Sequence, residues 1–357
     1  MHYYIHIPFC VSRCAYCDFF STTSLERRTE YVTALVREIG MRRNGTADTI
    51  YFGGGTPSVL EPDAIRCIIE AIGPIDTSAE ITLEANPGDL TEDKLRLLRQ
   101  VGVNRLSIGV QSFDDSLLRR IGRRHNSQQA LYAIRDAQTA GFDNISIDLM
   151  YGLPGQDMAT WQKDIETALQ SGIQHLSCYC LSYEQGTRLT LQLERGEVKE
   201  QDEDTLNDMY DRLCGQTEQA GYEHYEVSNF ALPSFRSRHN SSYWTDEAYI
   251  GVGAGAHSYD NERRIRSWNV SNLDKYIAAI SRGERPYEQE LVTDEQHRME
   301  QIMLGLRTNQ GVKKELVADN AHLKDYLSRG MILDTGTHYV VTRHGIRLLN
   351  RIVEHLV

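Results

Sequence analysis

Three cysteines near the start of the chain have a spacing suited to iron chemistry. Cys10, Cys14 and Cys17 form a Cys-x3-Cys-x2-Cys pattern within PFCVSRCAYCDFF. Thiolates are soft ligands, and three of them on one short loop can hold three irons of a 4Fe–4S cubane, which leaves the fourth iron open. A zinc loop is the alternative, but zinc normally takes four ligands, and no second Cys or His pair stands nearby at finger spacing. We therefore predict a 4Fe–4S cluster.

The other cysteines show no comparable pattern. The chain has seven in all, and this odd number argues against a disulfide framework. Cys67, Cys178, Cys180 and Cys214 stand among apolar neighbours, where a free cysteine usually behaves as a small buried side chain. We expect these four thiols to be buried and structural.

Composition indicates an ordinary globular protein. Of 357 residues, 40% are hydrophobic and 25% are charged. No run approaches the roughly 20 apolar residues of a membrane span, and the start MHYYIHIPFC lacks the basic and apolar regions of a signal peptide. We expect a cytoplasmic protein. The formal net charge of -12 disfavours a stable complex with nucleic acid.

Six candidate strands alternate with amphipathic stretches up to about residue 185. This alternation predicts βαβ units and an α/β fold, a partial (βα)6 barrel of the TIM type. Helical patterns include Glu26–Arg43 and Thr91–Val101. The expected strands are Tyr3–Ile7, Thr49–Phe52, Glu80–Ala85, Arg105–Val110, Asn144–Leu149 and His175–Leu181.

Five unusual features follow or end successive predicted strands. Cys10 follows the first strand and Gly53–Gly55 follow the second. Glu84 ends the third, Gln111 ends the fourth, and Asp148 lies near the end of the fifth. Because barrels of this kind carry their active sites at the carboxyl ends of the strands, all five features are expected to converge on one face.

These residues lie in segments that resemble a known family. The segments HIPFC, YFGGGTPS, LEANPGDL, SIGVQSF and IDLMYGLPG, with the cysteine motif, resemble radical SAM proteins. Within that superfamily they are similar to the porphyrin-related branch, which contains oxygen-independent coproporphyrinogen III oxidases and HemW-type heme chaperones. The resemblance implies a radical SAM barrel in which S-adenosylmethionine (SAM) chelates the open iron through its amino and carboxylate groups.

The resemblance assigns the glycine segment to SAM. Gly54, Gly55 and Thr56 would let the backbone approach the methionyl amino group, because a residue without a Cβ leaves room for a ligand. A simple tight turn is the alternative for a Gly-Gly-Gly run. Its place after the second strand and before Thr56-Pro57 favours the ligand.

The remaining SAM residues also follow from the resemblance. Glu84 can pair with the cationic end of the ligand, Asp148 can accept a hydrogen bond from a ribose hydroxyl, and Gln111 can bridge polar groups. Arg123 occupies the family position that binds a carboxylate, although an arginine within RRIGRRHN could instead belong to a solvated helix face. The resemblance places two tyrosines beside the cluster and cofactor, Tyr4 and Tyr16.

Two departures separate this chain from the oxidases. The oxidases carry a further cysteine two residues after the third, where this chain has Phe19. They also have a long amino-terminal extension, whereas Cys10 here stands near the start.

Residues 239–244, His-Asn-Ser-Ser-Tyr-Trp, match the HNxxYW motif of HemW-type proteins. A neutral His239 imidazole can ligate heme iron, and Tyr243 and Trp244 can lie against a porphyrin. An isolated histidine is more often a surface or core residue, but the complete motif favours a heme ligand.

The last third of the chain indicates a smaller α+β unit. The run YIGVGAGAHSY at 249–259 imitates a dinucleotide loop but lacks the following βαβ unit, so tight backbone packing is the better interpretation. A structural role for His257 is favoured over a porphyrin contact. After Thr293, helical patterns, a hairpin around Thr335-Gly336 and a final helix resemble a winged helix. We predict a barrel domain over 1–230 and a carboxyl-terminal domain over 231–357.

The leading functional hypothesis is a binding and delivery protein without oxidase turnover. The barrel would hold the 4Fe–4S cluster and SAM, and heme would pass to recipient heme proteins, expected to be respiratory. The enzyme alternative is an oxygen-independent coproporphyrinogen III oxidase, which decarboxylates propionates by way of a 5′-deoxyadenosyl radical. A third is radical SAM modification of another small molecule. The sequence leaves open SAM cleavage, a homodimer and transient membrane association.

Overall fold

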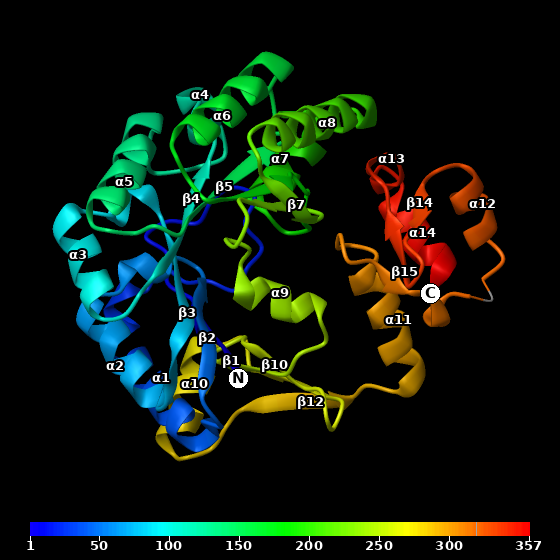
Figure 1. Ribbon diagram of the computed structural model, residues 1–357. Helices are drawn as coiled ribbons and strands as arrows, with labels where there is room; N and C mark the ends of the chain where they lie inside the picture. Colours follow the sequence, from blue (N-terminus) through cyan, green and yellow to red (C-terminus); the bar gives the residue numbers. More distant parts are fainter. Residues whose placement is uncertain (319) are drawn as a thin grey trace.

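Six parallel strands form the centre of the molecule. The structure, a computed structural model, describes residues 1–318 and 320–357. All six strands predicted from the sequence are present and pair in chain order, each parallel to the next (Figure 1). They are β1 (His2–Ile7), β2 (Ala47–Gly54), β3 (Ile75–Ala85), β4 (Arg105–Gln111), β5 (Ile145–Tyr151) and β6 (His175–Cys180).

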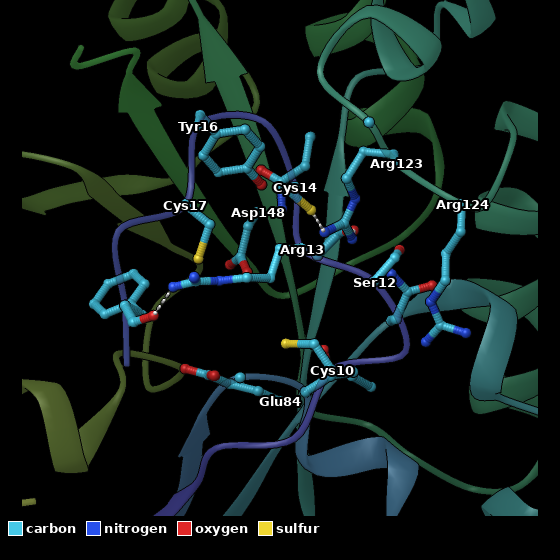
Figure 2. Close-up of a pocket in the computed structure, with 18 of the residues that line it drawn as sticks. Cys10, Ser12, Arg13, Cys14, Tyr16, Cys17, Glu84, Arg123, Arg124 and Asp148 are labelled. Atoms are coloured by element: carbon cyan, nitrogen blue, oxygen red, sulfur yellow. Dashed lines mark hydrogen bonds between the residues drawn. The ribbon is translucent and has the colours of Figure 1, made fainter. Parts of the chain in front are cut away.

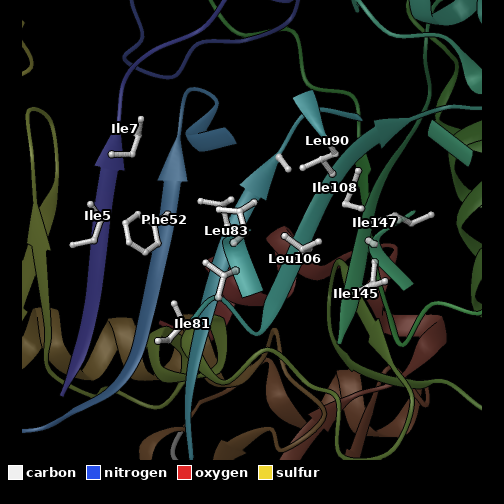
Figure 3. Packing of buried hydrophobic residues seen from close by; sticks show 14 of the residues in the cluster. Ile5, Ile7, Phe52, Ile81, Leu83, Leu90, Leu106, Ile108, Ile145 and Ile147 are labelled. Atoms are coloured by element: carbon white, nitrogen blue, oxygen red, sulfur yellow. The ribbon is translucent and has the colours of Figure 1, made fainter. Parts of the chain in front are cut away.

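Alternation along these strands separates an apolar face from a polar one, because successive side chains point to opposite sides of a sheet. The apolar set packs against the surrounding helices in one large core (Figure 3). It includes Ile5, Ile7, Phe52, Leu83, Leu106 and Ile147. The alternate positions carry Tyr4, Tyr51, Glu84, Ser107 and Asp148. The polar face of the curved sheet is therefore left to form a site.

Helices connect the strands and cover the apolar face (Figure 1). The predicted helix over 91–101 is confirmed as α3, with Thr91 as its N-cap, whose side chain accepts from the Lys94 amide. Short 3-10 turns occupy Leu25–Arg27, Pro57–Val59 and Pro87–Asp89. The helices are α1 (Arg28–Arg42), α2 (Pro62–Ile72), α3 (Glu92–Gln100), α4 (Asp115–Arg120), α5 (Ser127–Thr139), α6 (Met158–Gln170), α7 (Arg188–Glu194) and α8 (Glu203–Gln219).

The sheet extends beyond the predicted barrel to twelve strands. Its order is β12-β11-β10-β9-β1-β2-β3-β4-β5-β6-β8-β7, with β9 parallel to β1. The added elements are β7 (Glu223–Glu226), β8 (Asn229–Ala231), α9 (Arg238–Trp244), β9 (Tyr249–Val252), β10 (His257–Asp260), β11 (Ile265–Asn269), α10 (Leu273–Ser281) and β12 (Tyr287–Leu291). A domain division after residue 230 stays a prediction, and any division must account for the pairing of β9 with β1.

The end of the chain forms a smaller α+β part with a separate hydrophobic cluster. The predicted hairpin around Thr335-Gly336 is present as β14 and β15, in a three-stranded sheet of order β13-β15-β14. Its elements are α11 (Asp294–Gly305), β13 (Val312–Lys313), a 3-10 turn (Lys314–Leu316), α12 (Leu323–Ser328), β14 (Ile332–Asp334), β15 (His338–Val341), α13 (Arg343–Ile346) and α14 (Leu349–Leu356). In the described part of the chain, every helix is too short or too polar to cross a membrane.

Two sequence expectations about small residues have different outcomes. The glycine-rich run is tightly packed backbone, as predicted: a Cβ on Gly251 would lie 1.9 Å from the His257 carbonyl oxygen. The expectation that all four remaining cysteines are buried is wrong for two of them. Cys178 and Cys214 are buried, but Cys67 and Cys180 are exposed. Cys67 lies on α2 and Cys180 ends β6, where one side of the element faces solvent.

Candidate functional site

The loop after β1 carries the three motif cysteines and is fixed at both ends. The Cys10 amide donates to the Thr22 carbonyl at 2.9 Å, and the Thr22 amide donates to the Pro8 carbonyl at 2.7 Å, so the base of the loop is closed by backbone bonds. Further along, the Ala15 amide donates to the Ile121 carbonyl after α4 at 2.8 Å. These bonds hold the loop over the carboxyl ends of the parallel strands.

The three thiols surround one pocket, as Figure 2 shows, with the Arg13 side chain among them. Thr56 Oγ1 donates to Cys10 Sγ at 3.5 Å, and Arg123 Nη1 donates to Cys14 Sγ at 3.4 Å. Burial raises the pKa of Cys10 and of Cys17, so the thiols are protonated until a metal replaces the proton.

The donor set fits an iron–sulfur cluster. All three thiols are free of disulfides. Among the described residues, no three His, Cys, Asp or Glu side chains converge closely enough to hold one metal ion. A cubane needs a wider spacing, because each thiolate binds a different iron. Three soft ligands around a shared space, with an arginine and a hydroxyl donating to sulfur, match that requirement.

The glycines after β2 allow the strand end to pack under the cysteine loop. Gly54 has φ of +113°, and a Cβ there would lie 2.6 Å from His6 Cε1. A Cβ on Gly55 would lie 2.9 Å from the Phe9 carbonyl oxygen and 3.0 Å from Cys10 Sγ. Contacts within the chain therefore already require glycine at both positions. The approach of a ligand amino group to Gly54, Gly55 and Thr56, which all line the pocket, stays a prediction.

Two half-buried carboxyl groups face the same pocket. Glu84 accepts from the Tyr51 hydroxyl at 2.8 Å and from the Gly54 amide at 3.1 Å, and burial raises its pKa to about 7. Asp148 accepts from Ser107 Oγ at 3.1 Å, and burial raises its pKa to about 6. A cationic ligand would favour the ionised form of both groups. Such a pair suits a ligand that brings a cationic group to Glu84 and a hydroxyl group to Asp148.

Arg123 and Gln111 complete the pocket wall. Arg123 is half-buried, follows the end of α4 and lines the pocket, so the alternative of a solvated helix face is excluded by the structure. Its Nη2 donates to the Gly109 carbonyl, while its buried Nε has no partner among the described residues. Gln111 adopts a φ of +70°, which is uncommon without a special reason, at an irregularity in the β4–β5 pairing. Strain of this kind is often found where a side chain must be aimed at a ligand.

The two tyrosines assigned to the cluster differ in position. Tyr16 lines the pocket. Tyr4 does not; its ring lies beside the stacked rings of Tyr51 and His239, with ring centres 6.2 and 6.4 Å away, and its hydroxyl is 3.1 Å from His6 Nδ1. The side chain points to the polar face from the middle of β1.

The structure places His239 inside the barrel. Its side chain is fully buried, with Nδ1 2.7 Å from Thr49 Oγ1 and Nε2 2.9 Å from the Tyr243 hydroxyl. Glu80 accepts from the amides of Arg238 and His239 at 3.1 Å each and so caps α9. In this arrangement both imidazole nitrogens are occupied. Iron ligation by His239 would require one of these two hydrogen bonds to break, and it stays a prediction.

The motif residues also diverge from one another. Tyr243 lines a second, larger cavity with Tyr4 and Phe19, whereas Trp244 lines a small one with Tyr225 and Thr308. No single porphyrin face is formed by the three predicted heme residues. Tyr243 and Trp244 are neighbours on α9, and successive side chains of a helix point in different directions around its axis.

One buried residue of the polar face was missed by the sequence analysis. Arg105 begins β4 and is 1% exposed, and its Nε has no partner among the described residues. Burial raises the pKa of Asp148 and of Glu84, and the positive charge of Arg105 offsets part of that rise. The alternation of Arg105 with Ser107 and Gly109 along the strand could have indicated that its side chain faces inward.

Comparison with known proteins identifies the family. The chain matches the Radical SAM superfamily over residues 4–168. It is 36% identical to the heme chaperone HemW of Bacillus subtilis over 98% of this chain and 97% of that protein. It is 38% identical to the heme chaperone HemW of Lactococcus lactis over 87% of this chain and 83% of that protein. The chain belongs to the HemW family of radical SAM proteins.

The fold agrees with this assignment. The structure of the coproporphyrinogen III oxidase HemN from Escherichia coli superimposes with a TM-score of 0.84, covering 99% of this chain and 89% of that one. At 21% identity this likeness concerns the fold alone. Radical SAM membership implies a 4Fe–4S cluster and SAM, and the pocket of this HemW-family chain holds the predicted residues Cys10, Cys14, Cys17, Tyr16, Gly54, Gly55, Thr56, Glu84, Gln111, Arg123 and Asp148.

Proposed function

We propose that this chain is a heme chaperone, which binds heme and delivers it to recipient heme proteins. The observation that carries the proposal is sequence similarity to proteins named heme chaperone HemW. The chain is 36% identical to one of them over 98% of its own length and 38% identical to another over 87%. Phe19 supports it, because the oxidases that the chain resembles have a cysteine at that position. The recipients would be respiratory heme proteins.

The proposal assigns the cluster to Cys10, Cys14 and Cys17 and SAM to the pocket beneath them. A cluster with one open iron binds SAM and can supply an electron to its carbon–sulfur bond. The residues of the chain would orient the ligand: Glu84 would pair with its cationic end, Asp148 would accept a hydrogen bond from its ribose, and Arg123 would pair with its carboxylate. The bound cofactor and cluster would then bury the mouth of the barrel.

An oxygen-independent oxidase is the competing function, since HemN shares the fold. Two anaerobic assays on the cluster-loaded chain separate the alternatives. The first is a heme titration followed through the Soret band, and the second is the conversion of coproporphyrinogen III in the presence of SAM and a reductant. The proposal predicts saturable heme binding and no decarboxylated product. Product formation at a rate that depends on Cys14 would overturn it in favour of the oxidase.

A further inference from the structure

The largest cavity near the site lies beside the cysteine loop, on the other side of Phe19. It has a volume of about 770 Å³ and is bounded by β1, the cysteine loop, the β9–β11 strands and α11. Cavities of roughly 300–1,000 Å³ are typical of sites for cofactor-sized ligands. Its apolar and aromatic lining includes Tyr4, Phe19, Phe20, Tyr243, Tyr249, Met303 and Leu304. We call it the His257 cavity.

Among the described residues, two histidines line this cavity, and they differ in what they can offer a ligand. His6 is buried, with Nδ1 3.1 Å from the Tyr4 hydroxyl and Nε2 3.0 Å from the Phe20 carbonyl. His257 is exposed to the cavity, and its ring has no hydrogen-bond partner among the described residues. Its nitrogens are available, in contrast to those of His6 and His239.

The position of the His257 ring is fixed by the sheet. His257 begins β10 and pairs in register with Trp268 of β11. The two rings stack with centres 5.9 Å apart and an angle of 26°. Burial, then the charge of Arg266, lowers the pKa of His257, which favours the neutral imidazole. A neutral, oriented imidazole is the form that ligates iron.

Most charged side chains that line the cavity form ion pairs or hydrogen bonds with other side chains of the protein. The ion pairs and hydrogen bonds are His297–Asp246 at 2.6 Å, His2–Glu247 at 2.6 Å, Arg266–Glu300 at 2.6 Å and Arg266–Glu290 at 3.1 Å. Asp18 is exposed at the cysteine loop. With these charges paired, the aromatic and apolar side chains are left to meet the flat, apolar face of a porphyrin ring, whose carboxylates would have to point out of the cavity.

We infer that the His257 cavity is the heme site of this chain and that His257 is an axial ligand of the iron. This inference rests on the proposed heme binding and adds its location. Because Phe19 lines both this cavity and the cluster pocket, heme bound here would lie next to the cluster. Of the HNxxYW motif, Tyr243 lines this cavity. His239 does not line it, but its Nε2 forms a hydrogen bond with the Tyr243 hydroxyl from inside the barrel.

The test is an anaerobic heme titration of the cluster-loaded chain and its variants. His257→Gly should bind heme at least about tenfold more weakly, with a shifted Soret band, and added imidazole should restore the position of the band. His344→Ala removes another exposed histidine far along the chain and should bind like wild type. Met303→Trp, which fills the cavity from α11, should weaken binding without changing the ligand signature of the heme that does bind.

The outcomes separate the inference from the proposed function. If wild type binds heme and both His257→Gly and Met303→Trp keep its affinity and spectrum, the cavity assignment is wrong while the chaperone proposal stands. Loss of binding in His239→Ala alone, with the far-ultraviolet spectrum unchanged, would also overturn it in favour of the motif histidine. If wild type shows no saturable binding, the proposed function itself fails.

Discussion

The thiol of Cys14 is one of the three that surround the cluster pocket. In Cys14→Ser a hard hydroxyl replaces a soft thiolate, so we expect most of the iron and sulfide to be lost after anaerobic reconstitution. Metal and sulfide analysis measures this directly. Cys67→Ser is the matched control, because Cys67 is an exposed thiol on α2 outside the pocket. Equal iron content in the two variants would contradict the assignment.

The raised pKa of Glu84 makes stability depend on pH. Burial moves this pKa from 4.5 to about 7, so the folded chain holds the proton more tightly than the unfolded chain. The stabilisation is present below the unfolded pKa and is lost as pH rises to the folded value. Relative to Glu84→Gln, wild type free of cofactors should lose roughly 3 kcal/mol of unfolding free energy between about pH 4 and 8. Denaturant unfolding at both pH values tests this; parallel curves would refute it.

The end of β2 is the element whose backbone matters most for the pocket. Gly54→Ala places a Cβ at a φ of +113° and against the His6 ring, so we expect a loss of about 1–3 kcal/mol and weaker cluster retention. Gly40→Ala is the matched control, since Gly40 lies in α1 with nothing within 4 Å of the added Cβ. There the change should stabilise by about 0.5–1 kcal/mol. Thermal unfolding compares the two; equal effects would show that the turn is not constrained.

The elements predicted correctly are those whose signals are local. Each barrel strand is a short apolar run before a helical pattern, and parallel pairing then brings the ends of β1 to β5 together. The cysteine spacing is also local, and so is the capping threonine of α3. For this reason most of the pocket could be predicted residue by residue from the sequence.

The elements missed depend on contacts between distant segments. The burial of His239 comes from Thr49 and Glu80, which lie more than 150 positions earlier in the chain. No periodicity in a seven-residue helix could show that α9 enters the barrel. The strands β7 to β12 are only three to five residues long, and β12 is exposed along its whole length, so their patterns are too short to distinguish from loops.

The barrel core and the carboxyl-terminal hydrophobic cluster are separate, which predicts that the two parts of the chain differ in stability against local unfolding. Ile352 is fully buried in the carboxyl-terminal cluster and Leu106 in the barrel. Ile352→Ala should cost about 2–5 kcal/mol and open residues 294–357 first, since the clusters are separate. Hydrogen exchange should then accelerate in α14 and β15 but not in β1 to β6. As the matched variant, Leu106→Ala should accelerate hydrogen exchange in the barrel strands. Uniform acceleration across the chain in Ile352→Ala would instead show that the chain unfolds as one cooperative unit.

Heme delivery to an acceptor protein can be measured in an anaerobic transfer experiment. The cluster-loaded chain, saturated with heme, is mixed with a heme-free respiratory heme protein, and the two are separated and their Soret bands recorded. We predict that heme moves to the acceptor faster than from an equal amount of heme bound to serum albumin. Heme that stays on the chain, or moves no faster than from albumin, would contradict delivery by this chain.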